Sequence, residues 1–262
     1  MPGPPDRNIY VRSLARGLSV IRCFTADAPT QTVSQVAKGA GIDRAAARRM
    51  LRTLETLGYV QCEGQKFLLT PVMLYLGSVY LSTAPLWGTV EPVLRKLVTT
   101  FREASSAAIL DGIEIVHVVG IPGPRFMTTR VAVGSKLPAY CTSMGRILLG
   151  GLSDQNLDRI LKASQITKRT RYSVTSIPEL KRIIRRDYDR GWSFLNQELE
   201  EGLCAVAVPI VDRSQRVIAA INVICSPSRY PPGKMISRVL PRLKQAAREI
   251  NGMLFGEQSG AA

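Results

Sequence analysis

The apolar positions of the first seventy residues predict three short helices and a hairpin. A first helix begins near Ser13, because apolar side chains then recur at the spacing of one helical face: Leu14, Leu18, Ile21 and Phe24. Thr32 stands three residues before Gln35, which is the spacing of a capping box at the start of a second helix. Gly41 can supply a left-handed turn, and Asp43 is a suitable N-cap for a third helix.

The third helix combines an apolar face with a basic one. Its apolar positions are Ala47, Leu51 and Leu54, and its basic positions are Arg44, Arg48, Arg49 and Arg52. Residues 58–62 and 67–69 then read as two short strands around a turn that contains Gly64. Two helices, a recognition helix and a hairpin wing form a winged helix-turn-helix, which places its recognition helix in a DNA groove. The alternative is a basic surface helix without a partner.

Arginine suits DNA recognition because its planar fork can bind guanine N7 and O6 together or clamp a phosphate. Side chains at the second helix start, in the wing and on the first helix are placed for phosphate contacts, which position a protein without specifying sequence. The residues expected to contact DNA are Arg12, Ser13, Arg16, Thr32, Ser34, Gln35, Arg44, Arg48, Arg49, Arg52 and Lys66.

Residues 71–84 predict a linker helix that is apolar on nearly every side. A helix of this kind must be buried on several faces. We expect it to pack against its twin in a second subunit, because a winged helix that reads a palindromic promoter site also needs a two-fold partner. Burial of this helix inside its own chain is the alternative.

From Pro85 onward the pattern changes to mixed helices and strands. Asp111-Gly112 joins two apolar runs and is a strong hairpin signal. A helix is expected over 143–150, Ser153 caps the next, and Ser176 with Glu179 forms a capping box for a third. Strands are expected over 106–110, 113–119, 126–133, 192–196, 204–211 and 217–225, with long helices through 90–101 and 232–255. Hairpins with helices packed around them define an α+β domain.

These patterns divide the 262 residues into five segments. They are a loose arm (1–11), a winged helix-turn-helix domain (12–70), a linker helix (71–84), an α+β domain (85–256) and a tail (257–262).

Composition favours a polyanionic partner without locating its site. The net charge is +15, yet residues 1–70 hold only ten Lys and Arg against five Asp and Glu, so the excess is spread along the chain. Five cysteines without C-x-x-C spacing indicate reduced thiols in a cytoplasmic protein. No apolar run approaches the roughly 20 residues of a membrane span, so neither export nor membrane insertion is expected.

Signatures of catalysis are missing from the sequence. His117 is the single histidine and lies in an apolar run, where a core or edge position is expected. The glycines near Gly145 lack the ending of a phosphate-binding loop, and no His, Cys or carboxylate set has metal-ligand spacing. We therefore expect no catalytic residue, no metal and no cofactor, with Cys141 and Cys204 as inert or ligand-lining thiols. An enzyme tethered to nucleic acid and a non-specific architectural DNA binder are the competing interpretations.

A ligand pocket is expected where residues 137–146, LPAYCTSMGR, lead into a helix. The exposed N–H groups of a helix start bind a carboxylate well. Tyr140, Met144 and Cys204 could supply its walls, and Arg130 or Arg146 a charge partner. A simple strand-to-helix corner is the alternative.

The chain resembles the IclR family of bacterial transcriptional regulators over nearly its whole length. The resemblance rests on RSLARGLSVIRCF (12–24), GIDRAAARRMLRTLETLGYV (41–60), FLLTPVMLYLGSVYL (67–81), LPAYCTSMGRILL (137–149), GWSFLNQELEEGLCAVAVPI (191–210) and DRSQRVIAAINV (212–223). ARGLSVIRCF, RAAARRML, SSAAILDG and NQELEEGL are similar to the branch that controls aromatic-acid catabolism through protocatechuate and β-ketoadipate.

The resemblance implies a winged helix, a linker helix and a GAF-like effector-binding domain. It also implies a homodimer formed through the DNA-binding half, which can pair into a dimer of dimers. A small carboxylic-acid effector is expected near Ser143, Met144 and Gly145, with Cys204 on the opposite wall. Met144 and Tyr140 suit an aromatic or elongated acid better than a glyoxylate-sized one. The residues expected to contact the effector are Thr128, Arg130, Tyr140, Ser143, Met144, Gly145, Arg146, Cys204 and Asn222.

Overall fold

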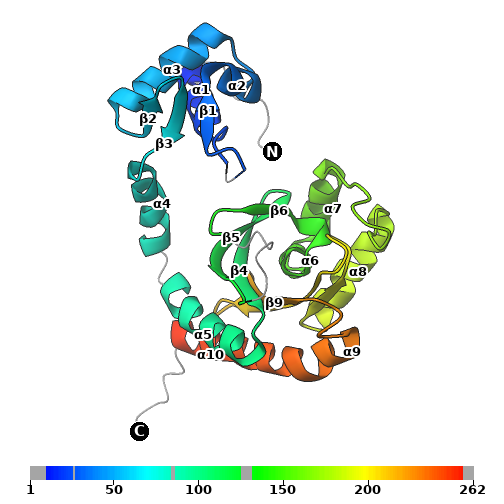
Figure 1. Cartoon of the computed structure of the whole chain (residues 1–262). Coiled ribbons are helices and arrows are strands. Elements are labelled where there is room, and N and C mark those ends of the chain that lie inside the picture. The colour runs from blue at the N-terminus through cyan, green and yellow to red at the C-terminus, as the bar shows by residue number, and fades with distance from the viewer. Residues whose placement is uncertain (1–9, 26, 84–85, 125–131, 256–262) are drawn as a thin grey trace. The chain divides into compact units, whose positions relative to one another are not determined.

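The computed structural model describes residues 10–25, 27–83, 86–124 and 132–255 (Figure 1). The chain divides into two compact units, Met1–Ala84 and Pro85–Ala262, which are described separately.

The first unit is a winged helix-turn-helix. Its elements are α1 (Arg12–Ile21), β1 (Thr30–Thr32), α2 (Val33–Ala40), α3 (Arg44–Thr56), β2 (Val60–Glu63) and β3 (Lys66–Leu69). The predicted caps are confirmed: Thr32 and Gln35 form the capping box of α2, Gly41 is left-handed at φ 63°, and Asp43 Oδ1 accepts from Ala46 N at 2.7 Å. The strand β1 was not predicted; it pairs with β3 and completes a three-stranded sheet.

The core of this unit lies between the helices and the wing. Val36, Ala47 and Leu51 are fully buried, and Phe67 of the wing packs against the same cluster. The outer side of α1 differs, because Leu14 is 63% exposed and Leu18 48% exposed in the single chain.

The linker helix is observed as α4, Val72–Thr83. Leu74, Tyr75 and Leu76 are 74%, 70% and 52% exposed, so the described residues of the first unit do not bury this helix.

The second unit is built on a six-stranded antiparallel sheet in the order β6-β5-β4-β9-β8-β7. The strands are β4 (Ala104–Asp111), β5 (Glu114–Ile121), β6 (Lys136–Pro138), β7 (Ser193–Asn196), β8 (Cys204–Val211) and β9 (Val217–Cys225). The helices are α5 (Leu86–Phe101), α6 (Ser143–Gly150), α7 (Asp154–Ala163), α8 (Ile177–Asp189), α9 (Pro232–Lys234) and α10 (Leu240–Phe255).

Helices cover both faces of this sheet. α5 and α10 pack together against one face, whereas α6 packs against the other and is backed by α8 (Figure 1). The predicted last helix is α9 and α10 joined by a π-helical segment, Met235–Val239. The core around α6 includes Ile147, Leu149, Leu157 and Leu180, all fully buried.

One prediction for this unit is wrong, and a second falls mostly outside the described residues. The predicted capping box before α8 is wrong, because Ser176 makes no side-chain cap and Glu179 instead pairs with Arg182 at 2.6 Å. Pro178 at the second helical position has no N–H, which removes one of the two donors that an N-cap side chain can bind and leaves only Glu179 N. The predicted strand at 126–133 falls mostly outside the described residues, and Ala132 and Val133 are not in a strand.

Candidate functional site

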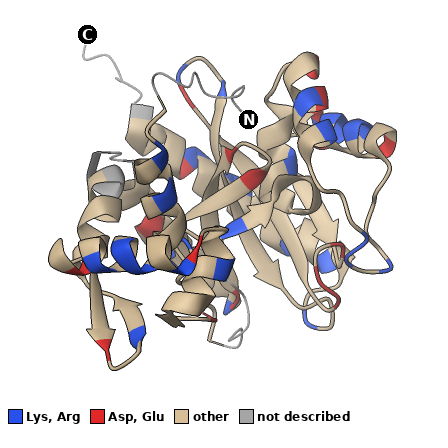
Figure 2. Cartoon of the chain, turned by 90° about the horizontal axis from the view of Figure 1, so that it is seen from above, with Lys and Arg blue, Asp and Glu red and all other residues tan. Residues whose placement is uncertain are grey.

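The recognition helix α3 presents three exposed arginines, of which Arg49 interacts electrostatically with Asp43 at the start of the helix. Arg44, Arg48 and Arg49 are exposed, and within the described residues none of them forms an ion pair. Arg52 is engaged differently: its Nη1 lies 2.6 Å from Glu55 Oε2, and its guanidinium carbon lies 5.6 Å from the Phe67 ring centre. Basic residues occur in both units (Figure 2), so the position on α3 matters more than the total charge.

The other residues expected at DNA surround this helix on the first unit. The side chains of Thr32 and Gln35 form the hydrogen bonds of the capping box, in which Thr32 N donates to Gln35 Oε1 at 2.8 Å. They therefore fix the start of α2, and their remaining capacity for a phosphate is limited. The rest are exposed on α1, α2 and the wing: Arg12, Ser13, Arg16, Ser34 and Lys66.

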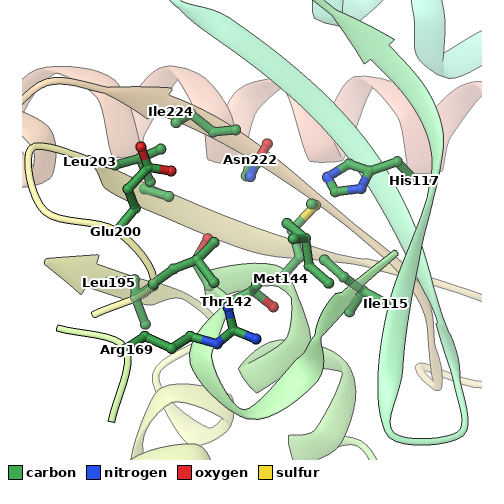
Figure 3. Close-up of a pocket in the computed structure, with 14 residues that line it drawn as sticks. Ile115, His117, Thr142, Met144, Arg169, Leu195, Glu200, Leu203, Asn222 and Ile224 are labelled. Carbon is green, nitrogen blue, oxygen red and sulfur yellow. The ribbon is translucent and has the colours of Figure 1, made fainter. Parts of the chain in front are cut away.

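A cavity of about 320 Å³ opens on the α6 side of the large sheet (Figure 3). Most of its wall is apolar, and polar groups interrupt that wall at a few points. Its lining residues are Ile115, His117, Leu137, Thr142, Ser143, Met144, Arg169, Leu195, Leu199, Glu200, Leu203, Ala205, Asn222 and Ile224.

Small side chains occupy several positions of the sheet around this hollow. Ser106 lies opposite Asn222 between β4 and β9, and Ala108 lies opposite His117 between β4 and β5. Ala205 of β8 lies opposite Ile224 and lines the cavity. Of these positions Ala205 is the one that lines the cavity, and its small side chain leaves space beside Ile224.

The N-terminus of α6 faces the cavity with an unsatisfied hydroxyl. Thr142 caps the helix by accepting from Gly145 N at 3.1 Å, which leaves the N–H groups of Ser143 and Met144 outside the described hydrogen bonds. Ser143 is 2% exposed, and its Oγ has no hydrogen-bond partner among the described residues. A buried unpaired hydroxyl beside a helix start is suited to an anion, since the helix dipole favours negative charge there.

His117 and Asn222 approach the cavity from the sheet. His117 is 1% exposed, and burial lowers the pKa of its imidazole below the ordinary value. Asn222 is held by Ser106, whose N and Oγ donate to Asn222 Oδ1 at 3.1 and 2.8 Å. In Figure 3 the His117 ring extends toward Asn222, and Arg169 approaches from another wall.

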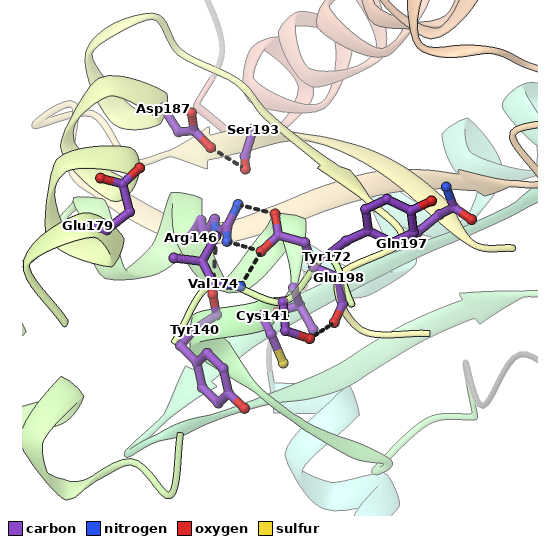
Figure 4. Close-up of polar contacts among 12 residues, drawn as sticks. Tyr140, Cys141, Arg146, Tyr172, Val174, Glu179, Asp187, Ser193, Gln197 and Glu198 are labelled. Atoms are coloured by element: carbon purple, nitrogen blue, oxygen red, sulfur yellow. Dashed lines mark hydrogen bonds and ion pairs between the residues drawn. The ribbon is translucent and has the colours of Figure 1, made fainter. Parts of the chain in front are cut away.

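Arg146 was expected to pair with the charge of an effector, but it forms an ion pair with Glu198 instead. Its Nη1 and Nη2 donate to the two carboxylate oxygens of Glu198 at 2.9 and 2.6 Å, and its Nε donates to Tyr140 O (Figure 4). Glu198 also accepts from Val174 N, so this pair joins α6 to two loops. Arg146 does not line the cavity.

Three further residues expected at the effector also lie outside the lining. The Tyr140 hydroxyl bonds with Thr167 O and N. Cys204 Sγ donates to Asn196 Oδ1 at 3.0 Å. Gly145 is a packing residue, because an added Cβ would lie 2.1 Å from Ala139 O. Ser143, Met144 and Asn222 do line the cavity, whereas Thr128 and Arg130 fall outside the described residues.

Several lining residues were not predicted as site residues. His117 was interpreted as a core or edge histidine, and it is buried but faces the cavity. Arg169 and Glu200 are exposed and lie on loops; Glu200 belongs to the NQELEEGL stretch, but nothing in that stretch marks it as a lining residue. The alternation along β5 could have placed His117 with Ile115 on one face, but no local signal located the two loop residues.

Neither a metal nor a membrane is indicated by the described residues. They contain no group of three or more His, Cys, Asp or Glu placed to hold a metal ion. None of the helices there has the length and apolarity needed to cross a bilayer.

A winged helix-turn-helix joined to an α+β domain with an internal cavity is the architecture of a ligand-responsive DNA-binding regulator. Comparison with known proteins agrees with this class. Residues 13–64 match the IclR helix-turn-helix domain, and residues 78–252 match the bacterial transcriptional regulator IclR C-terminal domain. The chain belongs to the IclR family of bacterial transcriptional regulators.

Relatives of known name cover nearly the whole chain. The Pca regulon regulatory protein of Pseudomonas putida is 38% identical over 97% of this chain and 87% of its own length. The p-hydroxybenzoate hydroxylase transcriptional activator of Acinetobacter baylyi is 32% identical over 94% of this chain and 92% of its own. A crystal structure from Rhodococcus sp. RHA1, described as a transcriptional regulator, is 43% identical, with TM-score 0.81 over 92% of this chain and 97% of that one.

Proposed function

We propose that this protein regulates genes of aromatic-acid catabolism, binding a palindromic promoter site as a dimer under the control of an aromatic carboxylate. The observation that carries the effector half of the proposal is the buried, unpartnered Ser143 hydroxyl at the start of α6, inside a largely apolar cavity.

The arginines of α3 support sequence-specific DNA binding. Arg44, Arg48 and Arg49 are exposed on the recognition helix and form no ion pair among the described residues, so their guanidinium groups are available to bases and phosphates. Arg52 is already paired with Glu55 and stacked near Phe67, which assigns it mainly to support of the wing.

The exposed apolar surface of the first unit supports a homodimer. Leu74, Tyr75 and Leu76 of α4, together with Leu14 and Leu18 of α1, would otherwise remain in water. A second copy related by a two-fold axis would cover these side chains and present two recognition helices to the two halves of a palindrome. A dimer of dimers remains part of the proposal as a higher assembly.

The cavity supports an aromatic carboxylate as the effector. The carboxylate would accept from Ser143 Oγ and from the first N–H groups of α6, and Arg169 at the rim would add a positive charge. The ring would lie among Ile115, Leu195 and Leu203. The name of the Acinetobacter relative, an activator of p-hydroxybenzoate hydroxylase, supports the same chemistry.

We assign the cavity a binding role and no catalytic one. Burial raises the pKa of the Cys141 and Cys204 thiols to about 11, so both are protonated at neutral pH and are weak nucleophiles. His117 contacts Ser135 and has no cysteine among its described hydrogen bonds. Turnover of a small acid that disappears in Cys141→Ala or Cys204→Ala would contradict this assignment.

DNA binding is tested by fluorescence anisotropy with the chain's own promoter region and a random duplex of equal length. We expect Arg48→Ala to weaken binding to the promoter by about 1–3 kcal/mol, if Arg48 reads a base, and to affect the random duplex less. Arg52→Ala is the matched control on the same helix and should have a smaller effect, because that guanidinium is already paired. Equal affinity of the unchanged protein for both duplexes would refute a sequence-specific regulator.

Effector binding is tested by thermal shift with protocatechuate, 4-hydroxybenzoate, benzoate, β-ketoadipate and short keto acids. A ligand present at about 100 times its Kd should stabilise the fold by about 2.7 kcal/mol. Ser143→Ala removes only the hydroxyl and should greatly reduce the aromatic-acid shift while DNA binding persists. Stabilisation by short keto acids alone would refute an aromatic effector.

A further inference from the structure

The cavity has a second polar end, formed by His117 and Asn222 on the sheet. Both residues lie beside β4, where Ala108 is the cross-strand partner of His117 and Ser106 that of Asn222. Alternation along β4 places Ser106 and Ala108 on one face, so the two polar side chains share the hollow above small neighbours.

The hydrogen bonds of His117 fix which ring nitrogen carries the proton. Nδ1 lies 3.3 Å from Ser135 O, and a carbonyl oxygen can only accept. The Ser135 hydroxyl donates to Ala132 O at 2.6 Å, so its oxygen is also able to accept from Nδ1, at 3.2 Å. Nδ1 is therefore the donor.

The other ring nitrogen is consequently a bare acceptor. Burial lowers the pKa of His117, so the ring is neutral at pH 7 and carries a single N–H. Among the described residues the side-chain hydrogen bonds of His117 all involve Nδ1, and Nε2 takes part in none. Figure 3 shows the His117 ring pointing away from its own strand and toward Asn222, which lines the same cavity.

Asn222 supplies the complementary donor. Its Oδ1 accepts from the N and Oγ of Ser106, and these bonds determine which way the amide points. The Asn222 amino group then faces the cavity, where no described acceptor meets it. An acceptor on β5 and a donor on β9, the two strands that flank β4, match one functional group well, namely a hydroxyl, which can donate and accept at once.

This end of the cavity disfavours a carboxylate. A carboxylate has no hydrogen to give to His117 Nε2, and the nitrogen and oxygen lone pairs would repel each other. The carboxylate of a ligand is thus directed to the Ser143 end, which offers donors, and a hydroxyl on the far side of the ring meets His117.

We infer that His117 and Asn222 read a ring hydroxyl of the effector, with the hydroxyl donating to His117 Nε2 and accepting from Asn222 Nδ2. The inference rests on the proposed function, in which an aromatic carboxylate occupies this cavity. It selects hydroxylated aromatic monoacids with the hydroxyl remote from the carboxylate, and it disfavours benzoate, salicylate-type isomers and dicarboxylates.

Isothermal titration of the full-length protein tests this selection with a matched set of acids. We expect 4-hydroxybenzoate to bind about tenfold more tightly than benzoate, because one donor–acceptor pair to buried groups is gained. 4-Methoxybenzoate keeps the oxygen but loses the donor, and 2-hydroxybenzoate places its hydroxyl beside the carboxylate. Both should bind no better than benzoate.

The variant His117→Phe assigns the preference to a residue. Phenylalanine keeps an aromatic ring but has no acceptor, so we expect 4-hydroxybenzoate to fall about tenfold to the affinity of benzoate, while benzoate changes by less than about threefold. Ile115→Val is the control on the same strand and face. It should weaken both acids by the same factor and preserve their ratio.

The possible failures are distinguishable. If none of the aromatic acids binds the unchanged protein, both the proposed effector class and this inference are overturned. If they bind but 4-methoxybenzoate equals 4-hydroxybenzoate, or if His117→Phe weakens benzoate as much as 4-hydroxybenzoate, this inference alone is overturned. The comparison of ligands on the unchanged protein remains decisive even if His117→Phe does not fold.

Discussion

Replacing Glu198 with glutamine would leave the guanidinium of Arg146 charged inside the second unit. The Arg146 side chain is 2% exposed and its bonds to both Glu198 oxygens, at 2.9 and 2.6 Å, compensate that charge. Arginine stays protonated in proteins, so it cannot escape by losing its proton. Arg190 lies near enough to interact unfavourably with Arg146 once the carboxylate is gone.

The expected cost follows from this burial. Breaking a buried ion pair by removing one partner costs about 3–5 kcal/mol. The amide oxygen of the introduced glutamine would still accept one weaker hydrogen bond, so we expect about 3 kcal/mol. With a urea m-value of about 2 kcal/mol per molar, the unfolding midpoint should fall by about 1.5 M.

Intrinsic fluorescence provides the assay, because both tryptophans of the chain, Trp87 and Trp192, belong to the second unit. A double replacement of Arg146 and Glu198 by methionine is the control. It removes both charges together and should recover most of the loss. A loss below about 1 kcal/mol for Glu198→Gln, or a double variant no more stable than the single one, would refute the reasoning.

Three further predictions concern stability and reactivity. Gly145→Ala should destabilise the second unit by about 2–3 kcal/mol in urea titrations, because its Cβ would meet backbone, whereas Gly88→Ala meets nothing within 4 Å and should not destabilise. Burial lowers the pKa of His117 in the folded protein, so the unfolded chain binds more protons as the pH falls through about 6.5, and the free energy of unfolding should decrease there. The prediction is contradicted if the free energy of unfolding does not change over this pH range, or if His117→Phe shows the same decrease as the unchanged protein. In native protein a thiol reagent should modify Cys62 first, and it should reach three buried thiols only on unfolding: Cys141, Cys204 and Cys225. Rapid labelling of those three before unfolding would show that the unit opens.

The first unit was predictable because its signals are local. The capping box at Thr32, the turn at Gly41 and the cap at Asp43 each depend on side chains within a few residues, and all three were found where the sequence places them. The strand β1 was missed because three residues, Thr30–Thr32, carry no periodicity; their pairing with β3 depends on a distant segment, Lys66–Leu69.

The cavity was only partly predictable, for a corresponding reason. Ser143 and Met144 follow from a helix start that can be read locally. Arg146 was misjudged because its partner, Glu198, lies 52 residues away and nothing in the sequence links the two. Arg169 and Glu200 reach the cavity from loops whose course depends on tertiary contacts, including the bond from Thr170 Oγ1 to Gln197 O.

The volume of the cavity and its hydrogen-bonding groups depend on different residues. Ala205 lines the open space, and its methyl side chain offers no hydrogen bond to a ligand. His117, Asn222 and Ser143 supply the polar contacts from other positions. A single Ala205→Val substitution would therefore reduce the cavity volume, so that only smaller ligands bind, while His117, Asn222 and Ser143 keep their positions. Homologues can in this way diverge in effector size through the strands, without rebuilding the groups that orient the ligand.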